Sequence, residues 1–151
     1  MALSDIQIRS LSPAALAYIG DAVYELYVRT HYLLPPRRSR AYHRLVVAQV
    51  RAEKQAQHLQ TLEPHLTDGE LQIIRRGRNA TLRKNKRVDP TVYQQASSFE
   101  TLIGYLYVAD PNRLLQLLGY LNLGSVSESL SCQLSFACFD LPSFSPYRFN
   151  Q

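Results

Sequence analysis

The chain has 151 residues, 46% of them hydrophobic, which is enough for one domain with its own core and argues against an intrinsically disordered protein. We see no signal-peptide pattern and no apolar run long enough to span a membrane, so we expect a cytoplasmic protein, or one of the plastid stroma. The two cysteines lack a matching pair of histidines, which argues against a structural zinc site, and a disulfide framework is not expected.

Positive charge is concentrated in one stretch of the chain. The net charge is +5, and seven of the seventeen Lys and Arg residues fall within residues 75–87, which contain no acidic residue. Such a patch is typical of nucleic-acid binding, although a solvated charged loop would have the same composition. The residues expected to contact nucleic acid are Arg75, Arg76, Arg78, Asn79, Arg83, Lys84, Lys86 and Arg87.

Helical periodicity runs through almost the whole chain, beginning with a helix that Ser12 should cap. Pro13 suits the first turn of this helix, which should end near Leu33, before the prolines at 35–36. Asp21 is expected to lie off its apolar stripe. The stripe consists of Leu16, Ile19, Gly20, Val23, Leu26, Tyr27 and Thr30.

Two further helices are expected in the middle of the chain. One long helix is predicted over about 40–62, in a segment rich in Ala, Gln, Leu and Val. Thr67 and Glu70 have the spacing of a capping box and should open a short helix. That helix should end near Gly77, with the glycine as its C-cap, and residues 79–88 should form a basic loop.

The last two helices are predicted to start at Asp89 and Asp110, each of which is followed by proline. The first of them carries Glu100, and the second should cover about 111–121. The residues of the first helix that should face the core are Phe99, Leu102, Ile103 and Leu106, whereas Ser97, Glu100, Gly104 and Tyr107 share another face.

The predicted fold class is therefore all-α, with a single helical domain over residues 1–121. Residues 122–151 are rich in Ser and Phe and alternate only weakly between apolar and polar side chains. We interpret them as an appended C-terminal tail, either flexible or packed on the domain, that carries no recognisable chemistry.

Two carboxylates stand out, because Asp21 and Glu100 each lie in an otherwise apolar, helix-patterned segment. A charge in such a place is costly unless it is paired or holds a cation. If the two helices pack side by side, with Gly20 and Gly104 allowing a close approach, the carboxylates would meet and favour a bound divalent cation. The alternative is a pair of ordinary ion pairs, Asp21 with Arg29 or a loop arginine and Glu100 with a lysine.

Three motifs, in this order, resemble the Mini-III branch of the ribonuclease III family. They are Leu16–Arg29, Arg75–Ala80 and Phe99–Tyr107. The resemblance covers roughly residues 10–121 and implies an all-α catalytic domain, a homodimer, and Mg²⁺-dependent cleavage of double-stranded RNA that leaves 5′-phosphates. It also implies that Asp21 and Glu100 are catalytic and bind the metal. Other ribonuclease III enzymes carry two more carboxylates, one turn before each of these; Ala17 and Ser97 stand there, a reduced set that Mini-III shares.

The resemblance also points to a substrate, the precursor of large-subunit ribosomal RNA, and leaves room for a ribosomal protein that assists its presentation. Because little chain follows residue 121, we expect the basic stretch 75–87 to supply the affinity for RNA. A-form RNA is recognised through its shape, phosphates and 2′-hydroxyls, and Arg and Lys suit the phosphate contacts.

Two rival interpretations come from other functional classes. One is a catalytically silent RNA-binding or ribosome-associated module on the same fold, which would be expected to lose the metal carboxylates. The other is a helical protein–protein adaptor, which gives no reason for a basic stretch flanked by two such carboxylates. The presence of both Asp21 and Glu100 favours the enzyme.

Overall fold

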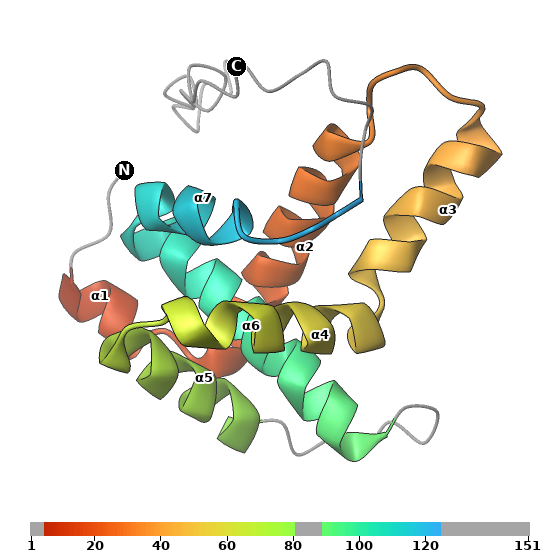
Figure 1. The fold of residues 1–151 in the computed structure, drawn as a ribbon. Helices are drawn as coiled ribbons and strands as arrows, with labels where there is room; N and C mark the ends of the chain where they lie inside the picture. Colours follow the sequence, from red (N-terminus) through yellow and green to blue (C-terminus); the bar gives the residue numbers. More distant parts are fainter. Residues whose placement is uncertain (1–4, 81–88, 125–151) are drawn as a thin grey trace, which may run out of the picture.

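Every regular element of the computed structural model, which describes residues 5–80 and 89–124, is helical (Figure 1). The predicted all-α class is confirmed. Within the described residues, no helix combines the length and the apolar character needed to cross a bilayer. The elements are α1 (Asp5–Ser10), α2 (Pro13–His31), α3 (Ser39–Val50), α4 (Ala52–Leu62), the short 3-10 helix η1 (Glu63–His65), α5 (Asp68–Ala80), α6 (Pro90–Ala109) and α7 (Pro111–Leu118).

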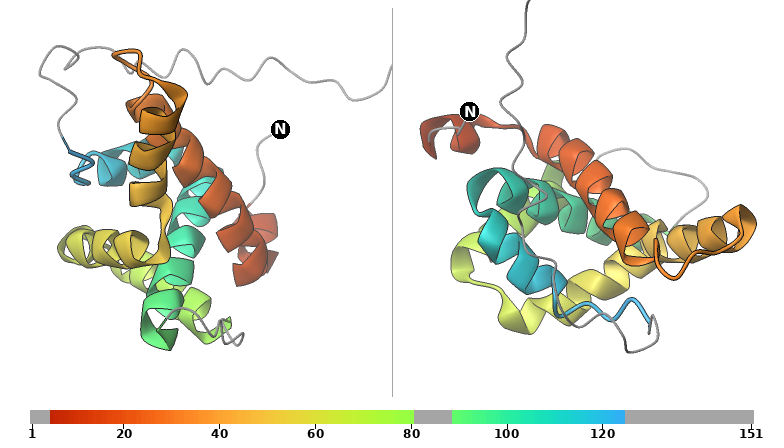
Figure 2. Two further views of the ribbon diagram at one scale, coloured as in Figure 1. Left: turned by 90° about the vertical axis from the view of Figure 1, so that its right-hand side faces the viewer. Right: turned by 90° about the horizontal axis from the view of Figure 1, so that it is seen from above.

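Helix α6 lies at the centre of the molecule and packs against α2, α4 and α5. The two further views in Figure 2 show α2 along one side of α6 and α4 along another. The central position explains why α6 has so many buried side chains. The four residues predicted to face the core, Phe99, Leu102, Ile103 and Leu106, are all buried.

The helix starts follow the capping signals in the sequence. The hydroxyl of Ser12 accepts a hydrogen bond from the backbone of the first turn of α2, and the carboxylates of Asp89 and Asp110 do the same for α6 and α7. At the start of α5, the Glu70 carboxylate accepts from the Thr67 backbone N–H at 2.8 Å, and the Thr67 hydroxyl accepts from the Glu70 N–H at 3.3 Å. All four predicted starts are therefore confirmed.

The buried stripe of α2 differs from the predicted one. The residues that face the interior are Leu16, Gly20, Tyr24 and Val28, spaced four apart. Leu26, a member of the predicted stripe, is 50% exposed, and Tyr24, which is not in that stripe, is fully buried. The reason is that α2 meets α6 along the row centred on Gly20, where the two backbones come closest.

The long helix predicted over 40–62 is two helices. Arg51 has an extended backbone, with φ −70° and ψ 152°, which ends α3 and precedes α4. Neither glycine nor proline marks this break, so local sequence gives no signal of it. The break lets α3 pack on α2 while α4 turns to pack on α6.

Helix α5 also differs from the prediction, because it continues through Gly77 to Ala80. Gly77 is buried against α6, where an added Cβ atom would stand 2.6 Å from the Thr101 hydroxyl oxygen. The glycine therefore allows a close helix contact instead of serving as a C-cap. The predicted basic loop over 79–88 begins inside α5, and its residues 81–88 lie outside the described part of the chain.

The packed part of the chain extends slightly beyond the predicted domain boundary at residue 121. Helix α7 ends at Leu118, three residues early, but Leu121 and Leu123 are both buried in the core. The Leu123 carbonyl accepts hydrogen bonds from the Tyr32 hydroxyl and from Gln49 Nε2. The rest of the predicted tail, residues 125–151, lies outside the described residues.

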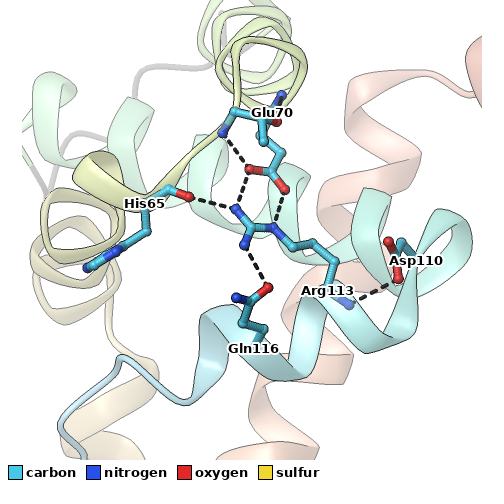
Figure 3. A network of polar contacts seen from close by, with 6 residues as sticks. His65, Glu70, Asp110, Arg113 and Gln116 are labelled. Carbon is cyan, nitrogen blue, oxygen red and sulfur yellow. Dashed lines mark hydrogen bonds and ion pairs between the residues drawn. The ribbon is translucent and has the colours of Figure 1, made fainter.

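A buried ion pair ties α5 to α7 (Figure 3). The Arg113 guanidinium donates to both carboxylate oxygens of Glu70, at 2.8 and 3.0 Å, and also to the His65 carbonyl at 2.6 Å and the Gln116 side chain at 2.8 Å. Burial alone would raise the pKa of Glu70, but the hydrogen bonds from Arg113 and the Thr67 backbone hold it below its ordinary value. This contact fixes the start of α5, whose far end borders the site described next.

Candidate active site

The two acidic motifs meet where α2 and α6 make backbone contact. A Cβ atom added to Gly20 would stand 1.8 Å from the Glu100 carbonyl oxygen, and one added to Gly104 would stand 1.9 Å from the Leu16 carbonyl oxygen. Only glycine fits at these two positions, because real Cβ contacts are much longer. The close approach places Asp21, next to Gly20, beside Glu100 on the facing helix.

The two carboxylates lie close enough for Asp21 to affect the ionisation of Glu100. Burial raises the pKa of Glu100 from 4.5 to about 7, and the nearby Asp21 carboxylate contributes to this rise as the second cause. The pKa of Asp21 is also raised, by partial burial and by the neighbouring Glu25 carboxylate. The side-chain amide of Gln55, on α4, lies close enough to both groups to lower the pKa of each. The arrangement therefore favours a positive charge between Asp21 and Glu100.

Among the described residues, no side chain supplies that positive charge. Arg29, a suggested partner of Asp21, instead forms an ion pair with Glu25 at 2.6 Å on the surface of α2. Over residues 5–80 and 89–124, neither Asp21 nor Glu100 has a salt bridge to a Lys, Arg or His. The ion-pair alternative is thus not what the described residues show.

A hollow of about 500 Å³ opens beside the two carboxylates, between α2, α5 and α6. Ala17 and Ser97, which precede Asp21 and Glu100 by one helical turn, both line it. Their small side chains leave space where longer carboxylates would stand. The full lining is Pro13, Ala14, Ala17, Tyr18, Asp21, Gly77, Ala80, Tyr93, Ser97, Glu100 and Thr101.

The basic end of α5 borders this hollow, because Gly77 and Ala80 contribute to its wall. The predicted nucleic-acid ligands on α5 are all exposed, and Arg76 donates a hydrogen bond to the Leu11 carbonyl at 3.2 Å. These residues are Arg75, Arg76, Arg78 and Asn79. The other four, Arg83, Lys84, Lys86 and Arg87, lie outside the described residues.

Sequence reasoning missed Gln55, Tyr93 and Thr101. Gln55 is only 2% exposed, although a glutamine on an amphipathic helix is ordinarily read as a surface residue. Tyr93 lines the hollow two turns before Glu100, and Thr101 lines it directly after Glu100. The spacing of Tyr93, seven residues before Glu100, does indicate a place on the same face of the helix. The positions of Gln55 and Thr101 depend instead on how α4 and α5 pack on α6.

The donors available to a metal are hard carboxylate oxygens. Within the described part of the chain there is no group of three or more His, Cys, Asp and Glu residues that could enclose an ion. Two carboxylates that have no cationic partner among the described residues and open on a hollow fit a divalent cation, which would keep several waters and take its other ligands from substrate phosphate.

Comparison with known proteins places this geometry in a family. The model of the ribonuclease III domain matches residues 14–111, a span that contains both Asp21 and Glu100. A Mini-ribonuclease 3 from Synechocystis sp. is 60% identical over 116 residues, covering 77% of this chain and 81% of the relative. The chain belongs to the Mini-III branch of the ribonuclease III family. The family that the three motifs suggested is thereby confirmed, and the protein is an endoribonuclease.

Other relatives agree with this assignment. A Mini-ribonuclease 3 from Gloeobacter violaceus is 54% identical over 112 residues, covering 74% of this chain and 83% of the relative. Among solved structures, protein FN1578 from Fusobacterium nucleatum matches with a TM-score of 0.70 and 24% identity, over 78% of this chain and 96% of that one. At that identity the structural likeness supports the fold alone.

Proposed function

We propose that this Mini-III endoribonuclease cleaves double-stranded RNA with a divalent cation, Mg²⁺, held by Asp21 and Glu100. The observation that carries the proposal is the meeting of these two carboxylates at the α2–α6 contact, without a cationic partner in the described residues. Such a pair is costly in the absence of a cation, so its presence in an endoribonuclease is best explained by metal binding.

The chemistry of phosphodiester hydrolysis suits this donor set. When bound, Mg²⁺ would activate a water molecule and stabilise the charge that develops on the phosphate oxygens. Asp21 is exposed and can reach the substrate, whereas Glu100 is half-buried and lies near the buried amide of Gln55. The space left by Ala17 and Ser97 admits the substrate phosphate beside the two carboxylates.

RNA affinity would come from the exposed basic end of α5, together with the rest of residues 75–87. Contacts of Arg and Lys with phosphates release counterions, so binding should weaken steeply as salt is raised. Changing Arg76 and Arg78 to Ala should weaken duplex binding and flatten its salt dependence. Unchanged binding would mean that another part of the molecule binds the RNA.

A homodimer would let one enzyme cut both strands. Tyr18 lines the hollow yet is 84% exposed, and Leu26 on the same helix is 50% exposed, so α2 presents apolar surface to solvent. We propose that a second copy covers this face and that each copy cuts one strand. Light scattering should give the mass of a dimer for the wild type and a shift toward monomer for Tyr18→Ser.

The proposed natural RNA is the precursor of large-subunit ribosomal RNA, with a ribosomal protein assisting its presentation, in the cytoplasm or the plastid stroma. This part of the proposal is supported by family membership alone. Cells that lack the protein should accumulate large-subunit ribosomal RNA with extended ends. Large-subunit ribosomal RNA with normal ends in such cells would rule out this RNA as the natural substrate.

The test of the proposed reaction is cleavage of an end-labelled RNA duplex. Wild type should cut in Mg²⁺ but not in EDTA and should leave 5′-phosphates, whereas Glu100→Gln should bind the duplex and not cut it. The matched control is Glu25→Gln, which changes a carboxylate of α2 that already pairs with Arg29; it should cut at nearly the wild-type rate. Wild-type cleavage by Glu100→Gln would refute the assignment.

A further inference from the structure

One buried polar group next to the two carboxylates lacks a hydrogen-bond partner among the described residues. Gln55, on α4, is 2% exposed, and within residues 5–80 and 89–124 its amide nitrogen Nε2 has no hydrogen-bond partner. Buried polar groups normally form hydrogen bonds within the protein, because a buried donor without an acceptor loses its hydrogen bonds to water and forms none in exchange. Among the described residues, the Tyr24 hydroxyl is the other buried side-chain atom without a partner, and the ring that carries it packs edge-on against His58 and Phe99.

Unlike the Tyr24 side chain, which packs on aromatic rings, Gln55 has two carboxylates near it. Its amide acts on both Asp21 and Glu100, although Nε2 does not reach full hydrogen-bond geometry with either. Asp21 belongs to α2, Glu100 to α6 and Gln55 to α4, so three separate helices bring one donor and two acceptors together. The donor has the chemistry to hold an ionised carboxylate oxygen in one direction.

A purely structural role accounts poorly for this residue. A hydrophobic side chain of similar length would fill the same space without burying an unmet donor. The neighbouring Gln57 on the same helix is exposed, as glutamines usually are. An unmet buried donor is expected instead where the group acts in a state other than the one described, such as one with a cation at the carboxylates.

We propose that Gln55 is a positioning residue: from the protein interior, its amide orients the Asp21 and Glu100 carboxylates toward the divalent cation that they hold. This inference rests on the proposed function, because it assumes a cation between the two carboxylates. Partners of this kind fix the orientation of metal ligands, and their loss commonly weakens metal affinity ten- to a hundredfold. In this role Gln55 would act through the two carboxylates and would not itself bind the RNA or the cation.

The test compares Gln55→Met with Gln57→Met as the matched control on the same helix. Binding of Mn²⁺ is measured by calorimetry without RNA, at a temperature where circular dichroism shows every variant folded. Gln55→Met should raise the Kd for Mn²⁺ about tenfold, and Gln57→Met should leave it unchanged. The metal-free thermal midpoint of Gln55→Met should stay the same or rise, because an unmet buried donor has been removed. A purely structural glutamine would give the opposite, a lower midpoint with unchanged Kd.

The Kd decides the outcome. A value for Gln55→Met within twofold of wild type overturns the inference while leaving the metal site intact. If wild type binds Mn²⁺ no better than the double variant Asp21→Asn, Glu100→Gln, the proposed metal site itself fails, and the role of Gln55 with it. Should Gln55→Met not fold, Gln55→Asn replaces it: its amide is one methylene too short to reach, so its Kd should also rise, and an unchanged Kd overturns the inference.

Discussion

Replacing Gly104 by alanine should open the contact on which the active site depends. The new Cβ atom would stand 1.9 Å from the Leu16 carbonyl oxygen and 2.8 Å from the carbonyl carbon. Because the nearest atoms belong to backbone, no side-chain rotation relieves the clash. Real contacts of this kind are at least about 3 Å, so α2 and α6 must separate by roughly 1 Å along the row that buries Leu16, Gly20 and Tyr24.

The size of the effect follows from two opposing contributions. Overpacking of a tight core costs about 1–3 kcal/mol even where side chains can adjust, and a clash between backbones lies at or beyond the upper end. Alanine regains about 1 kcal/mol of helix propensity over glycine. We expect Gly104→Ala to lose about 3 kcal/mol of unfolding free energy, which lowers the thermal midpoint by roughly 10 °C in a domain of this size.

Thermal and urea unfolding, followed by circular dichroism, measure this loss. The matched control is Gly69→Ala on α5, where an added Cβ atom has nothing within 4 Å; it should leave the midpoint unchanged or raise it slightly. Gly104→Ala should also weaken Mn²⁺ binding, since Asp21 and Glu100 move apart with their helices. A Gly104→Ala protein as stable as wild type would refute the backbone contact.

Three further predictions concern charge. The Kd for Mn²⁺ should tighten roughly tenfold from pH 6 to pH 8, because a Glu100 with a pKa of about 7 must lose its proton to bind a cation; a flat profile would contradict this. Burial lowers the pKa of His58 from 6.5 to about 4, with the charge of Lys54 as the second cause, so the folded state binds the proton less well than the unfolded chain. Stability should be full above pH 6.5 and fall by about 3 kcal/mol toward pH 4, and His58→Gln should lack this slope. Arg113→Met should lose about 2–3 kcal/mol by leaving the buried Glu70 carboxylate unpaired, whereas Arg29→Met, in an exposed pair, should leave the midpoint unchanged; equal effects would be inconsistent with the burial difference.

Local signals in the sequence were sufficient for the helix starts. Ser12, Asp89 and Asp110 each cap a helix through contacts within the next three residues, and Thr67 and Glu70 form the expected capping box. These interactions are decided by adjacent side chains, so they do not depend on the rest of the fold.

Features set by packing between distant helices were harder to predict. The break at Arg51 carries no glycine or proline and exists because α3 and α4 pack on different helices. Gly77 was interpreted as a helix end because a C-cap is a common role for glycine, whereas its role here is a close contact with Thr101. Leu26 fits an apolar stripe by spacing but lies on the exposed face of α2.

The candidate site was predictable in part. Asp21 and Glu100 could be singled out because a carboxylate in an apolar helix is costly, and the neighbouring glycines indicated that their helices would touch. Gln55 could not be found in this way, since a glutamine carries no charge and its burial depends on α4. Groups that support a site from a third helix leave no local pattern in the sequence.

The measurement that tests the central claim most directly is a crystal structure of the protein soaked in Mn²⁺, with an anomalous difference map. We expect one strong peak per chain between Asp21 and Glu100, about 2.1 Å from an oxygen of each carboxylate, and no such peak in Glu100→Gln. A Mn²⁺ peak at another site, with none between these two side chains, would contradict the account.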